Sequence, residues 1–211
     1  RLTDINSNIS EPAWSPNGKR IAFVNTYLQR NMNLSGIYVM NSDGTDRTRL
    51  TDNPTFDHWP DWSPDGNQIA YTQTNKLASI IMVMNFDGTG KRRLEPFAGF
   101  PGAYDSGPGI DREGAPVWSP DGSKIAFVSS SSYLLPVNNE IYVVNSDGSD
   151  LIQLTKNGTA NDTAPQWSPD GKKIVYQSDD DGSGRQGESN IWIVDAEGTG
   201  QPMVTIRLEG S

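Results

Sequence analysis

The chain of 211 residues contains no cysteine and a single histidine, His58. Without cysteine it forms no disulfide bonds and offers no thiolate ligands to a metal ion. One imidazole also cannot supply the several histidines found in typical zinc centres. No run of about 18 apolar residues occurs, so the sequence contains no candidate membrane-spanning helix. The sequence therefore contains neither a thiolate metal site nor a multi-histidine one.

The sequence is also poor in hydrophobic residues and carries an excess of negative charge. Hydrophobic residues make up 34% of the chain, which is below the about 45–50% of average globular domains even after allowing for the glycine that the latter figure includes. The formal net charge is −9. An acidic surface repels a phosphate backbone, so nucleic acid is not expected as a partner. Either the acidity attracts a basic protein segment or a cation, or it serves only to keep the protein soluble.

One short motif recurs along the whole chain. Trp-Ser-Pro-Asp-Gly, or its variant with asparagine, begins at Trp14, Trp62, Trp118 and Trp167. The intervals between these tryptophans are 48, 56 and 49 residues. Self-similarity with a period near this length is typical of repeat architectures. The sequence therefore predicts a single domain, 1–211, with repeat units at about 4–51, 52–95, 96–155 and 156–205.

Each unit predicts a sheet of four short antiparallel strands, the first of which ends at the tryptophan. In the Ser-Pro-Asp-Gly turn, proline fixes one backbone angle and glycine accepts the positive φ that closes the turn. A strand of Ile-Ala/Val-Phe/Tyr follows, and another aliphatic strand ends at an Asp-Gly or Glu-Gly turn. The last strand surrounds a leucine or valine six residues after that glycine. Four strands per unit are typical of a β-propeller blade, so the predicted fold class is all-β.

The combined motif resembles the TolB-type (WD-like) β-propeller repeat. The matching elements are Pro-x-Trp-Ser-Pro-Asp-Gly-x-x-Ile-Ala-Phe, then Ile-Tyr-Val-Met-Asn-x-Asp-Gly-Thr, then Leu-Thr, and they cover nearly all of the chain. The resemblance implies a bacterial, periplasmic or extracellular protein that binds a protein or peptide partner and is not an enzyme. Propellers of prolyl-oligopeptidase-like enzymes share the repeat, so an accessory domain of a larger hydrolase is an alternative. A third interpretation is a propeller that binds carbohydrate or metal.

Four units are fewer than the six or more blades common in TolB-type propellers. Either four blades close into a ring, or the chain is part of a larger propeller, or a half-ring is completed by oligomerisation. Leu2-Thr3 resembles the end of an outermost strand from a preceding unit. The chain also starts at Arg1 instead of methionine, so we expect either a removed leader or a longer parent protein.

The four repeat tryptophans are predicted to be structural. Trp14, Trp62, Trp118 and Trp167 hold one fixed place in the repeat, which favours burial between adjacent blades over stacking on a ligand. A core role predicts a large loss of stability when such a side chain is truncated.

Candidate partner-binding residues lie three positions before the repeat proline. Asp57, Glu113 and Asp162 hold this position, whereas the first unit has Ile9. In a propeller they would meet near one mouth of the axial channel and bind a basic side chain or a calcium ion. The alternative is that each carboxylate accepts hydrogen bonds from its own turn. His58 adjoins Asp57 and belongs either to the binding site or to the ordinary surface.

The long irregular segment 95–114 is the other candidate binding region. It contains Phe97, Phe100 and Tyr104 among glycines and prolines. Long loops on rigid scaffolds often carry function, and exposed aromatic rings make good anchors for a partner. The alternative is that these rings fold over one face of the propeller. No Gly-x-Ser-x-Gly nucleophile motif occurs, so we expect no catalytic residues, and no cofactor apart from calcium.

Overall fold

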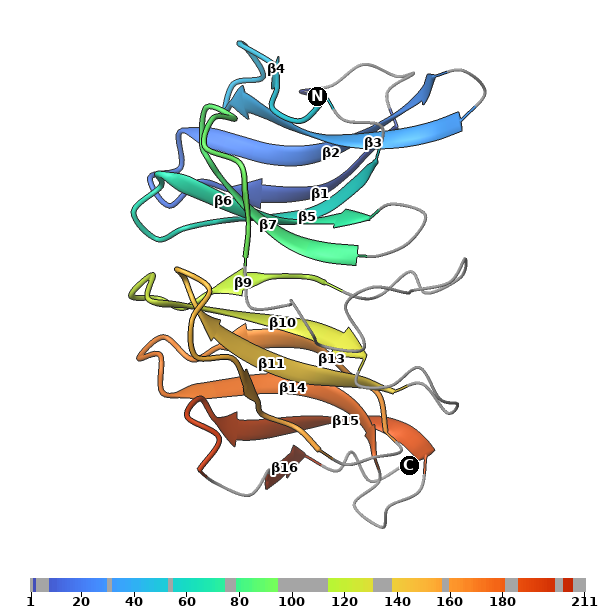
Figure 1. Cartoon of the computed structure of the whole chain (residues 1–211), viewed down its shortest axis with the longest axis vertical. Helices are drawn as coiled ribbons and strands as arrows, with labels where there is room; N and C mark the ends of the chain where they lie inside the picture. The colour runs from blue at the N-terminus through green and yellow to red at the C-terminus, as the bar shows by residue number, and fades with distance from the viewer. Residues whose placement is uncertain are drawn as a thin grey trace.

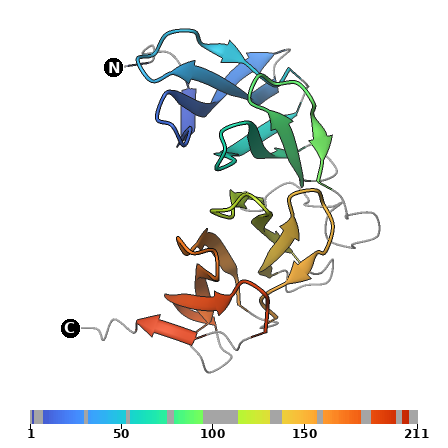
Figure 2. The same ribbon diagram turned by 90° about the vertical axis from the view of Figure 1, so that its left-hand side faces the viewer.

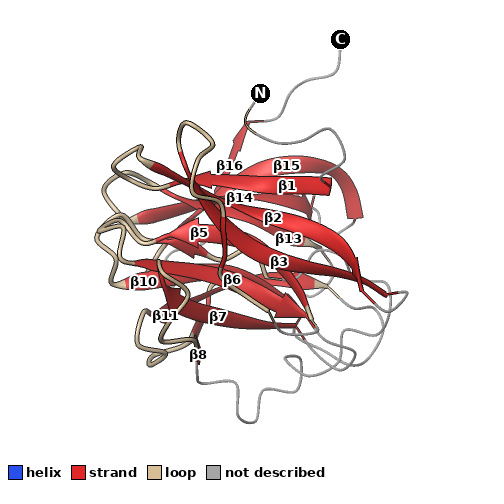
Figure 3. Cartoon of the chain, turned by 90° about the horizontal axis from the view of Figure 1, so that it is seen from above, coloured by secondary structure: helices blue, strands red, loops and turns tan. Residues whose placement is uncertain are grey.

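Strands and tight turns form all the regular structure in the described part of this protein. The computed structural model describes residues 2, 8–29, 32–52, 55–74, 79–94, 114–130, 138–156, 160–180, 186–199 and 203–206. These residues form sixteen strands. No helix is drawn among them in Figure 3. The predicted all-β fold is therefore confirmed. Within the same residues there is accordingly no helix that could span a membrane.

The strands form four blades, which follow one another along the length of the molecule in Figure 1. The first blade contains β1 (Asn8–Trp14), β2 (Arg20–Gln29), β3 (Met32–Asn41) and β4 (Thr48–Arg49). The second contains β5 (Phe56–Trp62), β6 (Gln68–Thr74), β7 (Ser79–Asn85) and β8 (Arg92–Arg93). The third contains β9 (Val117–Trp118), β10 (Lys124–Ser130), β11 (Asn139–Asn145) and β12 (Ile152–Gln153). The fourth contains β13 (Asp162–Trp167), β14 (Lys173–Asp180), β15 (Gln186–Asp195) and β16 (Met203–Ile206).

Each blade is an antiparallel sheet whose strands pair in chain order, as predicted from the repeat. In the third blade, for example, β10 pairs with β9 on one side and with β11 on the other, and β11 pairs with β12. A single parallel pair, Ser35 with Phe56, links the first two blades. Strand pairing is therefore almost confined to single blades, and neighbouring blades are joined mainly by side-chain packing and a few hydrogen bonds.

The Ser-Pro-Asp-Gly motif closes the first hairpin of each blade through a fixed set of hydrogen bonds. In the second blade the Gly66 N–H donates to the Ser63 carbonyl at 2.8 Å, with Gly66 at a φ of 72°. The Ser63 hydroxyl accepts the Gln68 N–H at 2.9 Å and lies 2.5 Å from the Asp65 carboxylate, to which it donates. The hydrogen bond from the Ser63 hydroxyl and a second one from the Asn67 N–H hold the pKa of the Asp65 carboxyl below its usual value. The turn is thus fixed by side chains that the motif itself supplies.

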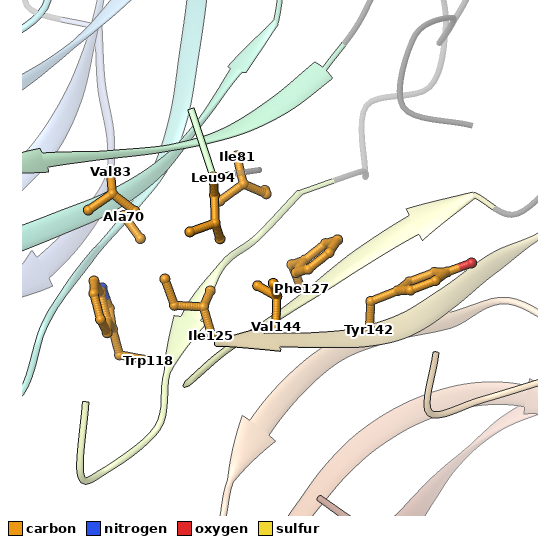
Figure 4. Packing of buried hydrophobic residues seen from close by; sticks show 9 residues of the cluster. All are labelled: Ala70, Ile81, Val83, Leu94, Trp118, Ile125, Phe127, Tyr142 and Val144. Atoms are coloured by element: carbon orange, nitrogen blue, oxygen red, sulfur yellow. The ribbon is translucent and has the colours of Figure 1, made fainter. Parts of the chain in front are cut away.

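The hydrophobic core lies between blades, in junctions made from the same repeat positions each time. The junction of the second and third blades, drawn in Figure 4, contains Ala70, Ile81, Val83, Leu94, Trp118, Ile125, Phe127, Tyr142 and Val144. The first four come from the second blade and the other five from the third. Equivalent residues fill the other two junctions. Each blade therefore has an aliphatic face toward the next blade and a tryptophan-bearing face toward the previous one.

Three of the four repeat tryptophans lie in these junctions. Trp62 and Trp118 are only 6% and 8% exposed, and Trp167 is half-buried. The indole N–H of Trp62 donates to the Ala13 carbonyl at 3.2 Å, and that of Trp167 donates to the Val117 carbonyl at 3.0 Å. Each of these indoles thus reaches the residue that precedes the tryptophan of the previous blade.

The prediction that all four tryptophans are buried is wrong for Trp14, which is 61% exposed. Its indole belongs to the face of the first blade that looks away from the second blade. The described residues place no other blade against that face, so most of the ring stays in contact with water. The repeat position alone does not bury a tryptophan, because burial requires a preceding blade.

The four blades form an open arc, with the first and fourth blades at its two ends in Figure 2. Contacts run from β1 to β5, from β5 to β9 and from β9 to β13, whereas no comparable contact joins described strands of the first and fourth blades. The closed four-bladed ring considered from the sequence is therefore not formed. The structure agrees with the alternative of a half-ring or part of a larger propeller.

Leu2 lies where a preceding blade would place a leucine. A Cβ added to Gly44 would lie 3.3 Å from the Leu2 side chain, and one added to Gly88 would lie 3.3 Å from the Leu50 Cβ. Gly44 and Gly88 hold the same position in their blades, both at positive φ. Leu2 therefore stands before the first blade as Leu50 stands before the second, in agreement with the resemblance of Leu2-Thr3 to an outermost strand.

Candidate functional site

The candidate site lies on the innermost strands of the arc. Strands β1, β5, β9 and β13 contact one another in sequence, whereas the fourth strands of the blades do not. Since neighbouring blades converge only at their inner edges, these strands line the concave side seen in Figure 2. A ligand on this side could therefore contact side chains from two neighbouring blades at once.

Three of the inner strands carry a β-bulge at the repeat proline. The register shifts at this point in β1, β5 and β13. The residue before each proline has positive φ: Glu11 at 54°, Trp59 at 50° and Ala164 at 52°. A residue other than glycine in this region costs about 1–2 kcal/mol, and bulges commonly redirect side chains beside functional sites. The residue before the repeat proline therefore has its side chain in a different direction from that expected in a regular strand.

Glu11, His58 and Trp59 meet across the first two blades and are named here the inner cluster. The Glu11 carboxylate accepts the Trp59 N–H at 2.5 Å, and its other oxygen lies 3.4 Å from His58 Nδ1. The His58 and Trp59 rings are 5.4 Å apart between centroids. The side chains of Glu11 and His58 are 25% and 30% exposed. The cluster therefore offers a carboxylate, an imidazole and an indole that remain partly accessible.

Phe56 adds an exposed aromatic ring at the start of the same strand, β5. It is 40% exposed, and it is one of few large hydrophobic side chains with that much exposure in the described part of the chain. Neither Phe56 nor Glu11 was identified from the sequence. Glu11 could have been found by aligning the residues before the four repeat prolines, where it stands against Trp59 and two alanines.

Asp57 is fully buried and makes local hydrogen bonds. Its carboxylate accepts from the Thr55 hydroxyl at 3.0 Å and lies 3.4 Å from the Gln73 amide nitrogen. Burial raises the pKa of Asp57, and hydrogen bonds from Thr51 and Thr55 act in the opposite direction. These contacts are of the kind expected if the carboxylate stabilises its own surroundings. Partner binding by Asp57 stays a prediction, and it would require the carboxylate to become accessible.

The structure does not show a ring of three carboxylates. Asp162 is also fully buried, on β13 opposite Ser178 of β14. The strands that carry Asp57 and Asp162 share no extensive contact, and Glu113 lies outside the described residues. Within the residues described, no three histidine or acidic side chains are grouped so that they could hold a metal ion. Calcium binding therefore stays a proposal.

The long segment 95–114 is described only at its last residue. Phe97, Phe100 and Tyr104 lie outside the described residues. The segment ends at Gly114, which is described and buried, with φ of 124°. A Cβ at Gly114 would lie 2.1 Å from the Thr72 hydroxyl of the second blade. Gly114 therefore fixes where the segment rejoins the propeller, against the inner half of the second blade.

Asp61, on the inner strand β5, makes a hydrogen bond that links the second blade to the third. Its carboxylate accepts the backbone N–H of Trp118 at 2.8 Å. Burial raises the pKa of this carboxyl group to about 6, and the hydrogen bonds from Trp118 and Trp62 act in the opposite direction. Asp61 was not identified from the sequence, although it precedes a repeat tryptophan where the other units have alanine, valine or glutamine.

Two crevices open between neighbouring blades. One, of about 250 Å³, lies between the first and second blades, where the Arg20 guanidinium sits 4.6 Å from the centre of the Phe86 ring. The other, of about 240 Å³, is lined by Asn139, Asn161, Thr163, Gln177, Asp179 and Ser189. In it Asn161 donates to both oxygens of Asp179, at 2.5 and 2.9 Å. Both oxygens of the Asp179 carboxylate are thus already hydrogen-bonded within the protein.

Four-stranded antiparallel blades packed face to face about inner strands define a β-propeller, here an open one. The chain belongs to the TolB β-propeller family, because the family model described as TolB beta propeller domain matches residues 1–114 and 106–210. The resemblance inferred from the tryptophan motif is therefore confirmed.

Known proteins match this chain over part of their own length. Over 75 residues it is 37% identical to the Tol-Pal system protein TolB of Alcanivorax borkumensis, covering 34% of this chain and 17% of that protein. TolB of Acinetobacter baumannii aligns with a TM-score of 0.67 and 22% identity, over 96% of this chain and 44% of that one. An acylaminoacyl peptidase of Pyrococcus horikoshii aligns with a TM-score of 0.65 and 16% identity, over 96% of this chain and 32% of the peptidase. At these identities the two structural matches show a common fold.

Proposed function

We propose that this propeller is a non-catalytic scaffold that binds a protein or peptide segment on the concave side of the arc, at the inner cluster. The observation that carries the proposal is the partly exposed contact of Glu11 with His58 and Trp59, held on two bulged strands. A carboxylate beside aromatic rings suits a segment with a basic side chain next to an apolar one. Phe56 extends the apolar part of this surface.

Rigidity of the scaffold favours such binding. The inner cluster is fixed by backbone and side-chain hydrogen bonds in both blades before a partner arrives, so little conformational entropy is lost on binding. The net charge of −9 would also speed the approach of a basic segment. Among the described residues, His58 contacts a carboxylate and an indole, neither of which is a typical nucleophile paired with histidine. These features support binding over catalysis.

A second candidate function is that of an accessory propeller in a larger hydrolase. The likeness of fold to the Pyrococcus peptidase, of which the chain covers 32%, favours it. Sequencing the gene on both sides of the segment that encodes these residues tests this possibility. A hydrolase domain in the same reading frame would support it, and an open reading frame without one would oppose it.

The cellular location is proposed from the same relationships. A match to TolB of a Tol-Pal system favours a periplasmic or extracellular site over the cytoplasm. Fractionation of the source cells, with antibodies against this chain and against known markers of each compartment, measures the location directly.

The binding proposal is tested by selecting phage-displayed peptides on the wild-type protein and measuring their affinity by fluorescence anisotropy. The selected peptides should contain a basic residue near an aromatic one. Glu11→Gln keeps an oxygen that can accept the Trp59 N–H but removes the charge, so it should weaken binding by about tenfold, as expected for one charge-assisted hydrogen bond. Glu197→Gln, the same change at an exposed outer turn, is the matched control. Equal affinities for wild type and Glu11→Gln would refute the proposal.

A further inference from the structure

The crevice between the third and fourth blades is lined by polar side chains. It has a volume of about 240 Å³ and is formed by Asn139, Asn161, Thr163, Gln177, Asp179 and Ser189. None of these side chains is apolar or positively charged. Pockets for drug-sized ligands measure about 300–1,000 Å³, so this crevice would hold a smaller molecule. It lies apart from the inner cluster, which belongs to the first two blades.

Several of these polar groups have no partner within the described part of the chain. Asn139 is only 7% exposed. Its backbone N–H donates to Asn161 Oδ1 at 3.3 Å, but its side-chain amide makes no hydrogen bond to any described residue. The same is true of the Gln177 amide and of the hydroxyl groups of Thr163 and Ser189. Because an unpaired buried amide is unfavourable, we expect water or a ligand in the crevice to complete its hydrogen bonds.

The same repeat position is satisfied within the protein at the junction of the first and second blades. There Ser35 holds the position of Asn139, two residues before the isoleucine of its strand. The Ser35 hydroxyl donates to the Asp57 carbonyl at 2.9 Å, and the Ser35 backbone pairs with Phe56 across the junction. The described strands of the third and fourth blades share no such pair. The larger Asn139 side chain is therefore left facing the crevice.

The fourth blade departs from the second blade in a related way. In the second blade the hydroxyl groups of Thr74 and Ser79 are 2.8 Å apart and share a hydrogen bond. The fourth blade has Asp179 and Ser189 at these positions, and Asp179 is bonded to Asn161 instead. Since the second blade folds with the shorter side chains, the polar groups of the crevice are not a requirement of the blade itself.

We propose that this crevice binds the ring of a neutral sugar. Amides and hydroxyl groups both donate and accept hydrogen bonds, and so do the hydroxyl groups of a sugar. The Asp179 carboxylate can accept a further bond from the ligand, because it has about four acceptor positions and Asn161 uses two of them. An apolar ligand would leave all of these groups unpaired, which strongly disfavours its binding.

The charges around the crevice favour a neutral sugar over an acidic one. Its only charged side chain is the Asp179 carboxylate, and neither lysine nor arginine lines it. An acidic sugar would meet this carboxylate without a compensating cation, on a protein whose formal net charge is −9. A uronic acid should therefore bind more weakly than the neutral sugar from which it derives.

The test is a titration of isotope-labelled protein with glucose, galactose and mannose, followed by proton–nitrogen NMR spectra that show the side-chain amide groups. We expect at least one sugar to shift the amide signals of Asn139 and Gln177, with a dissociation constant of about 0.1–10 mM. The signals are assigned from the spectra of Asn139→Ser and Gln177→Thr, in which one pair of amide peaks is missing. Each variant has the residue that the second blade uses at that position, so the fold should be kept, as a melting curve would verify.

Each of these two variants should raise the dissociation constant by at least about fivefold, because each removes hydrogen bonds to the sugar. Gln166→Thr, the same change at an exposed position of β13 outside the crevice, should leave it unchanged. The uronic acid of the best-binding sugar should bind at least about fivefold more weakly.

Three results would each overturn the proposal. The first is that no sugar shifts the amide signals at about 50 mM, which would mean that the crevice holds only water. The second is an equal dissociation constant for the wild type, Asn139→Ser and Gln177→Thr. The third is a uronic acid that binds as tightly as its neutral sugar, or more tightly.

Discussion

The junctions predict that one substitution, tryptophan to alanine, has very different effects at two equivalent positions. Trp62 and Trp14 begin the same motif in neighbouring repeats. Trp62 is 6% exposed and donates a hydrogen bond across the junction, whereas Trp14 is 61% exposed. The pair therefore separates the effect of burial from the effect of sequence context.

The expected losses follow from what each ring contacts. Truncating a buried tryptophan costs about 3–5 kcal/mol of stability, through lost apolar contact and the cavity left behind. Trp62→Ala also leaves the Ala13 carbonyl without its indole donor, so we expect a loss in the upper half of that range. Trp14→Ala removes a ring that is mostly in water and should cost about 1 kcal/mol or less.

Urea denaturation followed by circular dichroism measures both free energies of unfolding. Similar losses for the two variants, or a small loss for Trp62→Ala, would refute the argument that the junctions hold the fold together.

Three other perturbations give separate tests. Burial raises the pKa of Asp61 from 3.8 to about 6, so the folded protein holds this proton more tightly and loses stability as the pH rises from about 4 to 6. Asp61→Asn should remove that loss, so its stability relative to wild type should improve by up to about 3 kcal/mol between pH 4 and pH 7, and an unchanged difference would contradict this. Deleting 98–108 should abolish capture of selected peptides if the long segment contributes to binding, while the melting temperature stays close to that of wild type. Calcium at millimolar concentration should raise the melting temperature if the acidic positions bind it, and a titration without heat or thermal shift would exclude that role.

The repeat determined most of the fold because its information is local. The Ser-Pro-Asp-Gly turn is closed by bonds between Ser63, Asp65 and residues up to five positions away. Such turns, with apolar strands between them, are enough to predict antiparallel blades. The prediction that Trp62 and Trp118 are buried was also correct, because each has a preceding blade in this chain.

The inner cluster could be predicted only in part. The sequence indicated His58 as a candidate, but its contact with Glu11 joins residues 47 positions apart. The positive φ of Glu11 and Trp59 depends on a β-bulge, and no residue of the motif predicts this bulge. The buried state of Asp57 likewise depends on how the first blade packs against the second.

The sequence by itself determined what a blade is: its strands, its turns and the two kinds of face that it presents. Only the tertiary structure decided which faces are covered, and so why Trp14 and Ile191 are exposed while their equivalents are buried. The physical reason is that turns and strands depend on neighbours along the chain, whereas burial depends on what lies opposite in space. The same motif therefore produces the same kind of blade each time, and the first and fourth blades differ only because each has one face that no other described blade covers.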